Sequence, residues 1–320
     1  MKISFLVLGL ALALTLGCGS SDSSGTGGTA GAAGSAGAGG AGGTAGGGGE
    51  GPDFSPDPPL EIGPSERLSS VSIPSDYDPG VTYPLVMVLH GAGANGSVQA
   101  SYFGLFDLVD EKQFVMLYPD GTPNDSGSRR WNGAGCCTSD DSPDDVAYLS
   151  GLIEEAQQTY NVDPKRVYLV GHSNGGFMSF RLGCEVPNLF TAMMSLAGST
   201  YEDPADCEPG TPPVSVLVAH GTADATISYD GTPGFSPGAV EVAERSAGSA
   251  GCDPSMTTSL GTKDYLEAVE GEETEKVAYS SGCDDGLAVE LWTLNDGVHI
   301  PFLGTEFGAD MIDWLFSKSR

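Results

Sequence analysis

Six short, largely apolar segments are the feature of this sequence that most limits its possible folds. They span residues 85–89, 114–118, 167–170, 192–196, 214–219 and 288–294. Short apolar runs of this type are typical of strands covered on both faces, as in a parallel sheet. Because amphipathic segments alternate with them, the sequence predicts an α/β fold with a mostly parallel central sheet and helices on both faces.

The clearest predicted helix begins at Ser142 and Pro143. We expect Ser142 to be its N-cap and Pro143 its first helical residue. Its apolar residues then recur three and four positions apart, from Val146 to Tyr160. A last helix is expected around Met311, Ile312 and Leu315.

The N-terminal region predicts export. Residues 1–18 combine Lys2 with an apolar stretch of about 14 residues, which is short for a membrane span and typical of a signal peptide. The end of this stretch resembles a bacterial lipobox, with Cys18 as the lipidated residue, although Thr15 stands where leucine is usual. We therefore expect a lipoprotein of the outer membrane or cell surface, with plain secretion as the alternative.

The rest of the chain divides into two parts. Residues 19–59 are rich in Gly, Ala, Ser and Pro and predict a disordered tether. Residues 60–320 suit one large domain, which we expect to be monomeric. The formal charge of −30 disfavours nucleic acid and anionic membrane as partners, so membrane contact is expected only through the lipid anchor.

Seven cysteines fit export once Cys18 is set aside for lipid, because the other six form an even set. Cys252 and Cys283 flank one excursion of the chain and are expected to pair. A bridge between the adjacent Cys136 and Cys137 would be strained. These two are expected to reach Cys184 and Cys207, in an order that the sequence does not assign. No zinc-binding spacing is present, and the acidic stretch 140–145 lacks calcium-ligand spacing, so no metal site is predicted.

Residues 171–175, Gly-His-Ser-Asn-Gly, lie between an apolar strand and a predicted helix, the setting of a nucleophile elbow. Residues 234–238 match the same G-x-S-x-G pattern around Ser236, but no strand precedes them. Pro237 also has no N–H to offer where an oxyanion donor is needed. Ser173 is therefore the predicted nucleophile.

A serine nucleophile needs a base and a carboxylate that orients the base. Of four histidines, His172 belongs to the elbow, while His90 and His220 end strands. Only His299 occupies a loop before the last helix, where the chain order Ser, Asp/Glu, His places the base.

Asp224 is the predicted acid because it follows the strand 215–220 directly. The oxyanion donors are expected to be the backbone N–H groups of Asn174 and of Ala92. The second donor is assigned to within one residue of Ala92. Trp131 is a candidate for substrate contact, and packing in the core or a lid is the alternative.

These motifs together resemble the polyhydroxybutyrate depolymerase and feruloyl esterase group of α/β-hydrolases, which are secreted serine esterases. The resemblance is carried by residues 84–91, 118–121, 131–132, 136–137, 144–146, 171–176, 220–224 and 299. It implies an eight-strand-type sheet, a triad of Ser173, Asp224 and His299, and ester hydrolysis without a metal or cofactor. Residues 298–302, Val-His-Ile-Pro-Phe, depart from the Gly-His-x-Trp-Pro-Gly stretch of many members. This difference weakens the expectation that the polymer specificity of those members applies to this chain.

We therefore expect an exported serine ester hydrolase that acts on a carboxylic ester, polymeric or small. The candidate substrates are polyhydroxyalkanoate-type polyesters and feruloyl or acetyl esters of polysaccharides. Two alternatives stay open: a serine peptidase of the prolyl-oligopeptidase-like class, and a catalytically silent surface binding protein on the same fold.

Overall fold

The structure is a computed structural model that describes residues 53–136, 143–207, 213–284 and 286–320. The predicted signal peptide, Cys18, most of the predicted tether, Cys137 and Ser142 therefore lie outside the described residues. The described chain belongs to one compact unit, residues 51–320.

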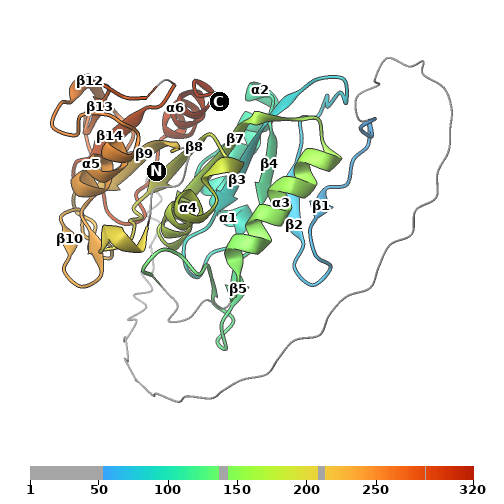
Figure 1. Cartoon of the computed structure of the whole chain (residues 1–320), viewed down its shortest axis with the longest axis horizontal. Helices are drawn as coiled ribbons and strands as arrows, with labels where there is room; N and C mark the ends of the chain where they lie inside the picture. The colour runs from blue at the N-terminus through green and yellow to red at the C-terminus, as the bar shows by residue number, and fades with distance from the viewer. Residues whose placement is uncertain (1–52, 137–142, 208–212, 285) are drawn as a thin grey trace, which may run out of the picture. The chain divides into compact units, whose positions relative to one another are not determined.

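The six predicted strands form the parallel centre of a ten-stranded sheet, whose order is β1-β2-β4-β3-β7-β8-β9-β14-β13-β12 (Figure 1). In spatial order these six are β4 (Val115–Tyr118), β3 (Tyr83–Leu89), β7 (Val162–His172), β8 (Ala192–Leu196), β9 (Ser215–Gly221) and β14 (Val289–Leu294). Their burial on both faces explains their apolar sequences. The predicted mostly parallel sheet is therefore confirmed.

Antiparallel strands extend the sheet at both edges, so it has two more strands than the resemblance implied. They are β1 (Glu61–Ile62), β2 (Ser69–Ser72), β12 (Thr258–Lys263) and β13 (Thr274–Tyr279). Two small hairpins lie outside the sheet: β5 (Thr122–Pro123) with β6 (Arg129–Arg130), and β10 (Gly231–Thr232) with β11 (Ser236–Pro237).

Helices cover both faces of the sheet, as predicted. One apolar core joins the sheet to α3 (Asp145–Thr159), α4 (Asn174–Glu185) and α5 (Ala239–Ser249). The core on the opposite face is built with α1 (Gly96–Tyr102), α2 (Leu105–Lys112) and α6 (Thr305–Phe316). Two short 3-10 turns, Pro187–Leu189 and Pro204–Asp206, complete the described elements. Successive residues of β3, such as Val86 and Met87, enter opposite cores because successive side chains of a strand point to opposite faces.

The start of α3 differs from the prediction. The N-cap is Asp144, whose carboxylate accepts a hydrogen bond of 2.9 Å from Ala147 N–H, and the helix begins at Asp145. Pro143 therefore precedes the helix. Aspartate is as good an N-cap as serine, so a run that contains both leaves the boundary open by a residue or two.

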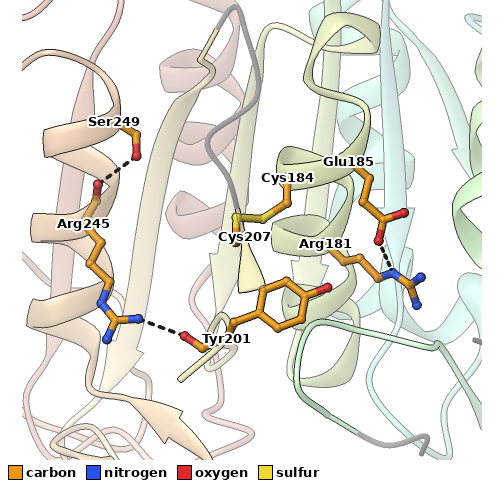
Figure 2. Close-up of a disulfide and its surroundings, with 7 residues drawn as sticks. All are labelled: Arg181, Cys184, Glu185, Tyr201, Cys207, Arg245 and Ser249. Carbon is orange, nitrogen blue, oxygen red and sulfur yellow. Dashed lines mark hydrogen bonds and ion pairs between the residues drawn. A yellow bond between two sulfur atoms is a disulfide. The ribbon is translucent and has the colours of Figure 1, made fainter. Parts of the chain in front are cut away.

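Two disulfides are present among the described residues. Cys252 is joined to Cys283, the expected pair. Cys184 is joined to Cys207, so the expectation that these two reach Cys136 and Cys137 was wrong (Figure 2). The last turn of α4 brings Cys184 beside the 3-10 turn before Cys207, with Cα atoms 5.3 Å apart, a normal disulfide spacing.

Among the described helices, none has both the length and the apolar character that a membrane span requires.

Candidate active site

Ser173 lies at a sharp turn between β7 and α4, with φ 52° and ψ −120°. A positive φ is strained for a residue with a side chain, and such strain is typical of a nucleophile elbow. The turn leaves no space at its two glycines: a Cβ on Gly171 would lie 2.3 Å from the Gly175 oxygen, and one on Gly175 would lie 2.1 Å from the Leu89 oxygen. The backbone packing therefore requires glycine at both positions.

The structure brings together the three residues predicted as a triad. The Nε2 atom of His299 lies 2.9 Å from Ser173 Oγ, and its Nδ1 atom lies 2.8 Å from Asp224 Oδ2. An ionised carboxylate can only accept, so Nδ1 carries the ring proton and Nε2 is free to accept the serine proton. The loops that follow β9 and β14 supply Asp224 and His299, and these neighbouring strands are parallel.

Four donors surround the Asp224 carboxylate. Oδ1 accepts from the backbone N–H groups of Thr226 (2.8 Å) and Ile227 (2.9 Å). Oδ2 faces two imidazoles, His299 at 2.8 Å and His220 Nε2 at 3.2 Å. Burial raises the pKa of Asp224, but the hydrogen bonds from His220 and His299 outweigh it and hold this pKa well below its usual range. The carboxylate is therefore charged at neutral pH.

The two other histidines hold backbone segments around Ser173. The buried ring of His90 contacts the Gly91 oxygen through Nδ1 (2.8 Å) and accepts from Gly121 N–H through Nε2 (2.9 Å). His172 donates from Nε2 to the backbone oxygen of His299 at 2.9 Å. Burial lowers the pKa of both rings, that of His172 to about 4. The structure places the predicted base His299 beside Ser173, but sequence order gave no sign that the other three histidines gather around the same centre.

The predicted oxyanion donors lie on two fixed backbone segments. Asn174 is the first residue of α4, where a backbone N–H has no partner within the helix. Its side chain exchanges two hydrogen bonds with the backbone of Trp131, of 2.7 and 2.9 Å. Ala92 is exposed, in a loop held by hydrogen bonds from Gly91 N–H to Gln99 (3.2 Å) and from Gly93 N–H to the Arg129 oxygen (2.8 Å).

Trp131 does not line the surface of the site, which corrects its candidacy for substrate contact. The side chain is fully buried, and its indole N–H donates to the His90 oxygen at 3.0 Å. The guanidinium of Arg67 lies 5.3 Å from its ring centre. Trp131 thus packs behind the site and holds the backbone of His90 and the side chain of Asn174.

The second G-x-S-x-G match has no comparable surroundings. Ser236 lies in β11 of a two-stranded hairpin, and within the described part of the chain its buried Oγ has no hydrogen-bond partner.

The segment that carries His299, residues 297–303, is anchored from its inner side. Besides the His172 bond, Tyr102 Oη donates to the Pro301 oxygen (2.8 Å), and the Phe302 oxygen accepts from Glu267 N–H (2.9 Å). The outward side chains are apolar: Val298, Ile300 and Phe302 are 52%, 61% and 74% exposed. These three exposed side chains, which flank His299 in the sequence, are called the apolar rim below.

Fold and site together define the class of the protein: it has the α/β-hydrolase fold. The model of the Esterase family, described as "Putative esterase", matches residues 64–217. The sequence is 33% identical to "Putative esterase NocK" of Nocardia uniformis over 151 residues, which are 46% of this chain and 42% of the relative. It is 24% identical to feruloyl esterase D of Neurospora crassa over 75% of this chain and 76% of that protein.

Among solved structures, acetyl xylan esterase from Aspergillus awamori shares the fold, with a TM-score of 0.58 and 14% identity over 80% of this chain and 98% of that one. The chain is thus similar in sequence to esterases over residues 64–217 and to feruloyl esterase D over most of its length, and it shares the fold of acetyl xylan esterase. It nevertheless spans less than half the length of the Nocardia relative.

Proposed function

We propose that this chain is an exported serine hydrolase of carboxylic esters. The observation that carries the proposal is that one imidazole, His299, lies within hydrogen-bond distance of both Ser173 Oγ and Asp224. The esterase family match and the feruloyl esterase relatives support ester bonds over peptide bonds as the target.

In the proposed mechanism, His299 Nε2 takes the proton of Ser173 as Oγ attacks the ester carbonyl. Asp224 keeps the other ring proton on Nδ1 and stabilises the imidazolium that forms. The backbone N–H groups of Asn174 and Ala92 bind the oxyanion of the tetrahedral intermediate. His299 then gives its proton to the leaving alcohol, and an acyl group remains on Ser173. Water deprotonated by His299 releases the acid and restores the serine.

The surroundings of the site favour an uncharged substrate with an apolar part. The apolar rim of Val298, Ile300 and Phe302 carries no charge, and the protein's charge of −30 disfavours anionic substrates. Polyhydroxyalkanoate-type polyesters and feruloyl or acetyl polysaccharide esters both meet this description. The relatives named above favour the polysaccharide esters.

A substrate panel tests the proposal: p-nitrophenyl acetate and butyrate, methyl ferulate, a hydroxybutyrate oligomer and a proline peptide. We expect turnover of at least one ester, with kcat lowered by at least about a thousandfold in Ser173→Ala. Ser236→Ala is the matched control and should retain full activity. Hydrolysis of the peptide alone, or full ester turnover by Ser173→Ala, would contradict the proposal.

We also propose that residues 1–18 direct export, that lipid is attached at Cys18, and that residues 19–59 tether a monomeric hydrolase of residues 60–320. The two disulfides support a compartment that permits them. Mass spectrometry of the mature N-terminus tests this directly. A lipid-modified Cys18 is expected, whereas an uncleaved Met1 would rule out processing.

A further inference from the structure

We propose that His220 is a positioning residue for the reaction: it shares the Asp224 carboxylate with His299 and so sets how strongly His299 binds a proton. This inference rests on the proposed function, because it deepens the role of the same site. Chain order alone assigned His220 to a strand end, but its contacts reach the Asp224 side chain.

The position of the His220 proton follows from its acceptors. His220 is 1% exposed at the end of β9, and its Nε2 atom lies 2.9 Å from the Ile227 oxygen and 3.2 Å from Asp224 Oδ2. A carbonyl oxygen can only accept, so Nε2 must carry a proton. That N–H lies within reach of both oxygens.

The other ring nitrogen supports the same assignment. His220 Nδ1 is buried and has no hydrogen-bond partner among the described residues. A proton there would be a buried donor without an acceptor, which is costly. Tyr229 packs edge-on against the ring, with centroids 5.9 Å apart. His220 therefore carries one N–H, which lies between the Ile227 oxygen and the carboxylate that orients His299.

Two imidazoles then compete for one carboxylate oxygen. Each N–H that Oδ2 accepts stabilises the negative charge and makes Asp224 a weaker acceptor for the other. When His299 becomes an imidazolium during acyl transfer, the stabilisation it receives from Asp224 is reduced by the share held by His220. The expected result is that Asp224 stabilises the imidazolium form of His299 less than it would without His220.

The titratable groups that face this centre come from each neighbouring segment. They are His172 from the end of β7, His220 from the end of β9, Tyr229 from the loop after Asp224, and His299 itself. Of these titratable groups, His299 is hydrogen-bonded to the Asp224 side chain, and His220 Nε2 lies 3.2 Å from its Oδ2 atom. A substitution at His220 therefore changes the carboxylate without touching Ser173 or the oxyanion donors.

The test compares His220→Leu with His220→Gln by the pH profile of kcat/KM on the best ester of the panel. Leucine removes the donor, so we expect kcat/KM at neutral pH to fall on the order of tenfold and the acidic limb to move to higher pH by roughly half a unit or more. Glutamine places an amide N–H near the position of Nε2. We expect it to restore the limb and to bring kcat/KM within about threefold of the native value.

Tyr229→Phe is the control for packing. It removes the Tyr229 hydroxyl contact with Thr293 (2.8 Å) but leaves the carboxylate untouched, so its pH profile should stay native even if its melting temperature falls. An acidic limb that is unchanged in a folded His220→Leu, or shifted equally by leucine and glutamine, would overturn the inference.

A readout without turnover separates this inference from the proposed function. The proton between His299 Nδ1 and Asp224 gives a downfield proton NMR resonance, which should be absent from Asp224→Ala. We expect this resonance to shift in His220→Leu and to return toward its native position in His220→Gln. No shift in His220→Leu would reject the role of His220 even if esters are cleaved. A shift without any ester turnover would reject the proposed function alone.

Discussion

The buried ring of His172 predicts a specific loss of stability in acid. His172 is 5% exposed, and its Nε2–H is used by the His299 oxygen. Burial lowers its pKa from 6.5 to about 4. In the unfolded chain the ring regains water and protonates near its ordinary pKa. Between these two pH values the unfolded state binds a proton that the folded state does not, so stability falls as the pH falls.

The magnitude follows from the difference between the two pKa values. At about 1.4 kcal/mol for each pKa unit, the shift from 6.5 to about 4 corresponds to roughly 3 kcal/mol, lost progressively as the pH falls from 6.5 to 4. This is a large part of the 5–15 kcal/mol typical of whole domains.

The assay is urea unfolding of the native protein and of His172→Gln at pH 7, 6, 5 and 4. Glutamine can offer an N–H to the His299 oxygen but does not titrate. The many acidic groups and His90 are common to both proteins, so they cancel in the difference between them. We expect the native protein to lose about 3 kcal/mol relative to His172→Gln from pH 7 to pH 4. A difference that stays constant with pH would refute this reasoning.

Three further predictions concern backbone contacts and crosslinks. Gly175→Ala should destabilise the protein by about 3 kcal/mol or more in urea unfolding, because its Cβ would meet the Leu89 oxygen. The control Gly151→Ala, in open space on α3, should stabilise it by up to about 1 kcal/mol, and equal effects of the two variants would contradict the packing. Asn174→Ala should cost about 2–4 kcal/mol by the same assay, because it leaves both backbone groups of Trp131 buried without these partners; a loss below about 1 kcal/mol would count against it. Replacing Cys184 and Cys207 together with serine should lower the unfolding free energy by about 3 kcal/mol, as expected for a crosslink spanning 23 residues; an unchanged melting temperature would contradict this.

The sequence predicts the centre of the fold better than its edges, for a physical reason. The parallel strands are covered on both faces, so burial makes them apolar throughout and easy to recognise. The edge strand β12, Thr-Ser-Leu-Gly-Thr-Lys, is almost entirely exposed and shows neither an apolar run nor alternation. Nothing local distinguishes such a strand from a loop.

The sequence likewise predicted some residues of the candidate site and missed the roles of others. Chain order and strand ends were enough to select Ser173, Asp224 and His299, because the α/β arrangement brings these strand ends together. Burial of Trp131 involves contacts with Arg67, His90 and Asn174, which are distant in sequence, so its neighbours in sequence do not encode it. For His220, the spacing of four residues to Asp224 across a strand end was the one available signal, and it became meaningful only with both side chains in place.

The anchoring of residues 297–303 has a consequence for how the proposed hydrolase can change. His172, Tyr102 and Glu267 hold the segment through carbonyl oxygens, which every amino acid possesses. The side chains of Val298, Ile300 and Phe302 take no part in these anchors. In the proposed hydrolase, we expect mutations there to alter substrate recognition while Ser173, Asp224 and His299 stay in place. The segment thus separates recognition from reactivity, which makes these three positions natural starting points for directed evolution of substrate choice.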